Sequence, residues 1–232
     1  MTINYDGNKT QLYGGTSFLA HASVGGEMKA ADYGLDGGWA GLRTTKALVN
    51  LFPNNDGSVD KRAQFFTNGQ SLEINSLSTF TDGYAITKYQ NKNSAGVSGT
   101  NATFVDVDFP LFRLAEMYLI YAEATLRGGA GDNGLALTYF NNLRTRAYGN
   151  TSGNLTALNL DLILSERARE LYWEGHRRTD LVRFGRFTTD TYLWPWKGGA
   201  KAGKSVEAFK NIFPLPSADV TANPNLVQNT GY

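Results

Sequence analysis

The chain has 232 residues, no cysteine, and 22 Lys and Arg against 21 Asp and Glu, which leaves a formal charge of +1. Its length suits one large domain or two small ones with a substantial core, and so small a net charge makes nucleic acid an unfavourable partner. Disulfides, thiol nucleophiles and Cys-ligated zinc are excluded, and no apolar run reaches the roughly 18 residues that cross a bilayer.

The first segment, residues 1–108, is predicted to consist mainly of loops. Gly, Asn and Thr are frequent there, and Asp36-Gly37-Gly38 and Asn55-Asp56-Gly57 are strong turn signals. The alternation in Asp82–Asn91 predicts a strand. Pro53–Asp60 has oxygen ligands at alternate positions, but lacks the Glu that closes a calcium loop, so a plain surface turn is the competing interpretation.

The second segment, residues 109–187, is predicted to be helical. Apolar residues recur at steps of three and four from Pro110 until Gly128-Gly129 ends the pattern. A second helix is expected over Asn133–Ala147, with Asp132 as its N-cap. Two such helices form a hairpin of the tetratricopeptide type, which needs neighbours to bury its remaining faces.

A third helix, expected over Asp161–Glu174, carries Glu166, Glu170 and Glu174 on one stripe. A carboxylate pair could hydrolyse a glycosidic bond. However, arginines flank every carboxylate, and nearby positive charge keeps a carboxylate ionised rather than ready to donate a proton. The interpretation we favour is an ion network, joined by His176, that locks this helix to the C-terminal loops. The other histidine, His21, fits no triad or zinc spacing.

The last segment, residues 188–232, is predicted to be loop, because four prolines remove backbone donors and disfavour regular structure. The sequence gives no cofactor motif and no metal site.

Exposed aromatics are the candidates for ligand binding. An exposed flat ring can stack on the apolar face of a sugar while polar neighbours bind its hydroxyls. Trp39 lies among four glycines, and a core anchor is its alternative role. The five candidate ligand-binding residues are Tyr13, Tyr33, Trp39, Trp194 and Trp196, with no catalytic residue among them.

Several motifs occur together in one order along the chain. They are "GGWAGLRTTKALVNLF" from Gly37, "DKR" from Asp60, "LFRLAEMYLIYAEATLRGG" from Leu111, "ELYWEGHRRTDLVR" from Glu170, and the closing "FPLP", "NPNL" and "QNTGY". Together they resemble the C-terminal half of the SusD/RagB family, which comprises outer-membrane glycan-binding lipoproteins of Bacteroidetes.

The resemblance implies a mainly α fold with long loops and minor β structure, and a role in binding polysaccharide or oligosaccharide without catalysis. It implies a SusC-type TonB-dependent transporter as partner, and starch or another α-glucan as ligand. It also implies a location at the outer surface of the outer membrane, through an N-terminal lipid anchor absent from this chain, which is itself expected to be soluble. A glycoside hydrolase and a pure protein-interaction module remain the alternatives.

Overall fold

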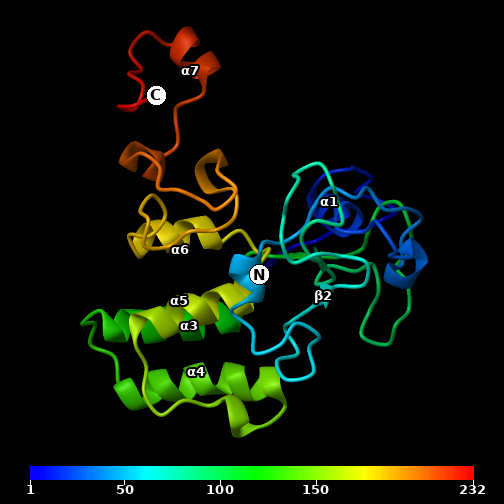
Figure 1. Ribbon diagram of the computed structural model, residues 1–232, viewed down its shortest axis with the longest axis horizontal. Coiled ribbons are helices and arrows are strands. Elements are labelled where there is room, and N and C mark those ends of the chain that lie inside the picture. Colours follow the sequence, from blue (N-terminus) through cyan, green and yellow to red (C-terminus); the bar gives the residue numbers. More distant parts are fainter. The chain divides into compact units, whose positions relative to one another are not determined.

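A computed structural model describes all residues, 1–232, and divides them into two compact units, Met1–His176 and Arg177–Tyr232. The fold is mainly helical with four two-residue strands, which confirms the predicted class (Figure 1). None of its helices combines the length and the apolarity needed to cross a membrane.

Three helices form the layered helical part of the first unit. Helix α3 (Leu114–Leu126) packs against both α4 (Asn133–Tyr148) and α5 (Leu160–Leu171), and the first two form the expected antiparallel hairpin (Figure 1). Asp132 caps α4, because its side chain accepts a hydrogen bond from the backbone N–H of Leu135. The predicted hairpin is therefore confirmed, although α3 begins at Leu114, after the extended Phe109–Pro110.

The rest of the first unit is loop-rich and holds two apolar clusters. One gathers around Val24, Leu35, Phe80 and Val105, and the other around Phe52 and Ile86. The regular elements here are short. They are β1 (Thr2–Ile3), which pairs with β4 (Phe109–Pro110); α1 (Gly15–Ala22); a 3₁₀ turn, η1 (Ala30–Tyr33); α2 (Lys46–Val49); and β2 (Phe65–Phe66), which pairs with β3 (Ala85–Ile86).

The strand predicted over Asp82–Asn91 is wrong in its length. Only Ala85–Ile86 forms a strand, and two isolated bridges, Thr44 to Tyr84 and Ser71 to Asp82, replace the rest of the ladder. Alternation in the sequence reports which side chains are buried, but continuous pairing needs a partner strand of equal length, which the surrounding loops do not provide.

The third predicted helix also ends earlier than expected, at Leu171 rather than at Glu174. Trp173 adopts a positive φ of 61°, which a helix cannot accommodate. Side chains from distant segments satisfy the freed carbonyl groups: Arg113 donates to Glu170, Lys88 to Tyr172, and Tyr89 to Trp173. Tertiary contacts, invisible in the local pattern, therefore set this helix end.

The second unit contains more helix than its prolines suggested. It begins with α6 (Arg177–Arg183) and, within the segment expected to be loop, adds α7 (Ser217–Ala222) and the 3₁₀ turns η3 (Lys197–Gly199) and η4 (Ala208–Asn211). Helix α7 begins directly after Pro216, where a proline costs no helical hydrogen bond. A further 3₁₀ turn, η2 (Thr151–Gly153), follows α4 in the first unit.

Candidate functional site

Trp39 lies on a loop that is hydrogen-bonded along the end of α1. Its backbone N–H donates to the carbonyl of His21 at 2.9 Å, that of Ala40 donates to Val24, and those of Gly41 and Leu42 both donate to Ala22. The approach is close enough that a Cβ on Gly38 would overlap the carbonyl oxygen of Val24. Glycine at position 38 therefore lets the loop lie against α1 and places Trp39.

The indole of Trp39 packs on a buried ring and is itself partly exposed. It stacks on the imidazole of His21, with ring centroids 4.8 Å apart and 16° between the planes. His21 is only 1% exposed, whereas Trp39 is 40% exposed. A buried ring thus supports a solvent-facing one.

Trp39 is part of a group of four rings, here called the aromatic cluster: Tyr13, Phe18, Trp39 and Phe104. Tyr13 lies 6.1 Å from Trp39 and 5.2 Å from Phe104, and Phe18 lies 6.3 Å from Trp39, all measured between ring centroids. Tyr13 is 65% exposed and Phe18 is 43% exposed. Such a surface offers flat apolar faces, a hydroxyl group and an indole N–H to a ligand.

Tyr33 and Arg43, which lie near Trp39 in the sequence, have other contacts. Tyr33 is half-buried against the core around Val24 and Leu35, and burial, followed by the negative charge of Asp32, raises its pKa. Arg43 donates to the carbonyls of Asp82 and Leu77 and lies 5.9 Å from the Phe80 ring. Asp36 is the neighbour that keeps a half-exposed carboxylate, and the hydroxyl of Thr103 donates to it. The structure therefore brings Tyr13 and Trp39 together and directs Tyr33 toward the core.

Trp194 and Trp196 belong to the second unit. Trp194 is half-buried, stacked with Phe187 at 5.9 Å and covered by the ammonium of Lys197 at 4.7 Å from the ring. Lys197 itself is 2% exposed and donates to the carbonyl of Tyr192. Trp196 is also half-buried and adopts a positive φ of 67°. Their surroundings resemble a small local core more than an open surface.

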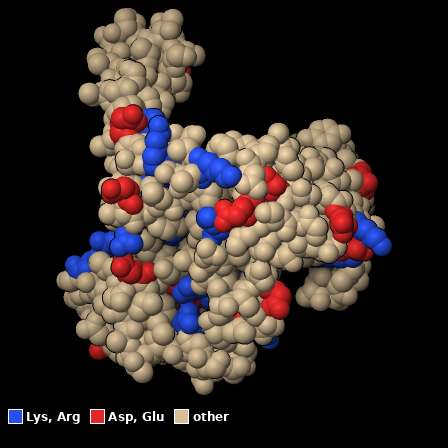
Figure 2. Space-filling view, in the orientation of Figure 1, with Lys and Arg blue, Asp and Glu red and all other residues tan.

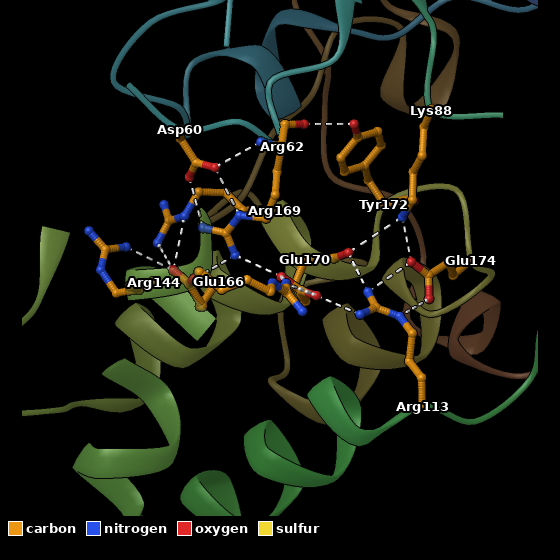
Figure 3. A network of polar contacts seen from close by, with 11 residues as sticks. Asp60, Arg62, Lys88, Arg113, Arg144, Glu166, Arg169, Glu170, Tyr172 and Glu174 are labelled. Carbon is orange, nitrogen blue, oxygen red and sulfur yellow. Dashed lines mark hydrogen bonds and ion pairs between the residues drawn. The ribbon is translucent and has the colours of Figure 1, made fainter. Parts of the chain in front are cut away.

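The predicted ion network exists, and Figure 3 shows it at close range. Glu166 lies 2.7 Å from Arg62, 2.6 Å from Arg169 and 2.9 Å from Arg144. Glu170 contacts Arg62, Arg113 and Arg146, while Glu174 contacts Arg113 and Lys88.

The partners of the network correct one expectation. Arg62, Lys88 and Arg113 precede the hairpin, so these contacts tie α5 to the loop-rich part of the first unit. His176 does not contact Glu174 in this network; its Nδ1 lies 3.6 Å from Glu116. Positively and negatively charged side chains also lie beside one another on the face drawn in Figure 2.

These carboxylates are poorly suited to act as general acids. Burial raises the pKa of Glu170, but hydrogen bonds from Arg113 and Arg146 outweigh it and hold the pKa at about 2. The pKa of Glu166 is also lowered, since Arg62, Arg169 and Arg144 outweigh its burial. A general acid needs the opposite shift of its pKa, toward neutral pH.

The turn Pro53–Asp60, whose oxygen ligands are spaced as in a calcium loop, does not form a metal site. Its Asp60 is buried against Arg62, and no group of three or more acidic or His side chains could hold a metal ion.

Sequence reasoning missed Phe18, His21 and Phe104. Phe18 and His21 lie three residues apart on α1, the spacing that puts two side chains on one helix face, so their common direction could have been found. Phe104 carried no signal, because its approach to Tyr13 depends on the path of a loop distant in sequence.

The first unit thus combines a helical hairpin, a buried ion network and a loop-rich part that carries an exposed aromatic cluster. Residues 61–232 match the SusD family, and the chain belongs to that family. Over an alignment 275 positions long, it is 35% identical to "Starch-binding protein SusD" of Bacteroides thetaiotaomicron, and the alignment covers 100% of this chain and 48% of that protein.

Solved structures agree with this assignment. "Surface glycan-binding protein A" from Bacteroides uniformis matches with a TM-score of 0.62 and 26% identity over 83% of this chain and 42% of its own. A SusD superfamily protein from Bacteroides vulgatus matches with a TM-score of 0.60 and 26% identity, covering 87% and 42%. The chain thus spans about half the length, or less, of these relatives.

Proposed function

We propose that this chain binds polysaccharide or oligosaccharide without catalysis, through sugar rings that stack on Trp39 and Tyr13. The single observation that carries the proposal is the exposed indole of Trp39, backed by His21 and adjacent to the exposed Tyr13 ring. Stacking of this kind needs a flat ring whose orientation is fixed before the ligand arrives, because ordering it on binding would cost free energy.

Polar groups around the cluster suit sugar hydroxyls. The half-exposed Asp36 carboxylate accepts hydrogen bonds, and the Tyr13 hydroxyl can donate or accept them. Each aromatic contact contributes about 0.5–1.5 kcal/mol beyond the area that it buries. The ring centroids of Tyr13 and Trp39 lie 6.1 Å apart, so the two rings can contact neighbouring parts of one oligosaccharide. Weak contacts along a polymer then add through multivalency.

The ligand class proposed is starch or another α-glucan. Its support is the name of the 35%-identical relative, a starch-binding protein, while a structural relative at 26% identity is named for glycan binding. The finer proposal follows from family membership: the whole protein would lie at the outer surface of the outer membrane, held by a lipid anchor, and deliver glycan to a SusC-type TonB-dependent transporter. Trp194 and Trp196 remain candidates for additional sugar contacts.

Isothermal titration of the chain with maltooligosaccharides, cyclodextrins and unrelated glycans tests the proposal. The variant Trp39→Ala should weaken α-glucan binding by about tenfold or more, since about 1.4 kcal/mol corresponds to a factor of ten. Phe112→Ala is the matched control, because Phe112 is a 56% exposed aromatic of the same unit outside the aromatic cluster, and this variant should bind as the original chain does.

Three results would contradict parts of the proposal. Equal glycan affinity of Trp39→Ala and the original chain would show that the glycan binds outside the aromatic cluster. Preference for a β-linked or uronic glycan would leave the proposed site unchanged but would show that the ligand is not an α-glucan. Failure to bind any glycan by the folded chain, together with Trp39-dependent binding to the transporter, would favour the protein-interaction module instead.

A further inference from the structure

Both ring nitrogens of His21 face backbone carbonyl oxygens. Nδ1 lies 2.7 Å from the carbonyl oxygen of Gly37, and Nε2 lies 2.9 Å from that of Thr103. A neutral imidazole has one N–H donor and one acceptor lone pair, whereas the doubly protonated ring has two donors. A carbonyl oxygen can only accept, so the neutral ring leaves one of these contacts as two facing lone pairs, inside a site that is 1% exposed.

The other surroundings of the ring also suit a positive charge. The charged group that faces it is the carboxylate of Asp36, whose Oδ1 lies 4.0 Å from Nδ1. The other carboxylate oxygen of Asp36, Oδ2, accepts a hydrogen bond from the hydroxyl group of Thr103. This contact joins the two loops that hold the ring. The face of the imidazole meets the Trp39 indole at 4.8 Å, within the distance at which a cation is attracted to an aromatic face.

We infer that His21 is a positioning residue for the glycan site, and that its doubly protonated form is the one that holds Trp39 in place. Protonated His21 joins three elements through one ring: the helix α1 that carries it, the Gly37 turn that leads to Trp39, and the Thr103 loop that leads to Phe104. This inference rests on the proposed glycan binding for its functional consequence, while its structural part stands without a ligand.

The direction of the pH dependence follows from the contacts. Loss of one proton from His21 removes a donor from a buried carbonyl oxygen and removes the charge beneath Trp39. The order of the site and its glycan affinity are therefore greatest while both ring nitrogens carry a proton, and they fall when the ring loses one proton at higher pH. The expected loss of glycan affinity on removal of that proton is about tenfold.

The first test needs no sugar. In ¹⁵N-labelled protein, long-range imidazole correlations report the protonation of His21 from pH 5 to 9, and the indole N–H signal of Trp39 reports its surroundings. We expect His21 to show two protonated nitrogens at the acid end and the Trp39 signal to follow the His21 curve. A His21 ring that is neutral throughout the range, or a Trp39 signal that ignores its titration, would overturn the inference.

The second test measures glycan affinity as a function of pH in the original chain and in two variants. His21→Phe keeps a flat ring under Trp39 but supplies no donors, so its affinity should be low and independent of pH. His176→Asn removes the other histidine of the chain and should retain the original pH profile. If no glycan binds at any pH, the proposed function fails, while the imidazole and indole spectra still decide the role of His21. A His21→Phe variant with the original profile would reject that role.

Discussion

The guanidinium of Arg62 lies 2.7 Å from the carboxylate of Glu166, although 104 residues separate the two in sequence. This contact, together with those of Lys88 and Arg113, joins the loop-rich part of the first unit to α5. Charge pairs, together with the apolar cluster in which Phe52 and Ile86 pack with Tyr172, therefore tie α5 to the loop-rich part of the first unit.

Glu166→Gln should strongly destabilise the first unit. Glu166 is fully buried and neutralises Arg62, Arg144 and Arg169, so its loss leaves buried positive charge without a partner. The expected loss of unfolding free energy is ~3–5 kcal/mol, measured by urea denaturation. Glu73→Gln is the matched control, since Glu73 pairs with Lys46 at the exposed surface and should contribute at most about 1 kcal/mol. Equal effects of the two substitutions would contradict this account.

The same network predicts how the protein responds to acid. Arginine contacts hold the pKa of Glu170 at about 2, below its ordinary value of 4.5, so the folded state binds this proton less readily than the unfolded chain. The stabilisation is complete above about pH 4.5 and is lost as the pH falls toward 2, amounting to ~3 kcal/mol from this group. Unfolding free energies measured between pH 7 and 2 should show this fall, and a flat profile through that window would disagree with it.

The two neighbouring glycines before Trp39 should respond differently to alanine. A Cβ on Gly38 would overlap the carbonyl oxygen of Val24, whereas a Cβ on Gly37 meets nothing within 4 Å. Gly38→Ala should therefore lift the loop from α1, lower stability by ~1–3 kcal/mol and weaken glycan binding. Gly37→Ala should leave both thermal stability and affinity nearly unchanged. Matching behaviour of the two variants would show that the close approach does not position Trp39.

Two tyrosines predicted together from the sequence should separate by experiment. Tyr33 packs against the core, so Tyr33→Ala should lower the unfolding free energy by ~2 kcal/mol without removing a sugar contact. Tyr13 is 65% exposed, so Tyr13→Ala should change stability by less than ~0.5 kcal/mol and still reduce glycan affinity severalfold. Calorimetry and glycan titration on both variants give the comparison, and a stable Tyr33→Ala protein with lost affinity would reverse the assignment.

The sequence predicts the helical hairpin well, because its determinants are local. Asp132 caps α4, and the glycines after α3 end a pattern with helical spacing. The end of α5 was not predictable in this way, since Arg113, Lys88 and Tyr89 satisfy its last carbonyls from a distance. Ion pairing of the glutamates could be inferred from the surrounding arginines, but the particular partner Arg62 could not, because charge patterns do not report which loop reaches a helix.

In the candidate site, too, some features could be predicted from local sequence and others depend on contacts between distant segments. Exposure of Trp39 could be expected from its glycine-rich surroundings, whereas its support by His21 depends on a loop laid along α1 by backbone hydrogen bonds. Tyr13 and Tyr33 looked alike in sequence because both are near glycines. Only the tertiary packing separates a tyrosine in the core from one on the surface.

A crystal structure of the chain with a bound maltooligosaccharide would show whether sugar rings lie on Trp39 and Tyr13. We expect a glucose ring stacked on the exposed indole of Trp39, the next part of the ligand against Tyr13, and a sugar hydroxyl group within hydrogen-bond distance of Asp36. A well-ordered oligosaccharide bound elsewhere, with no sugar on the aromatic cluster, would overturn the proposed site.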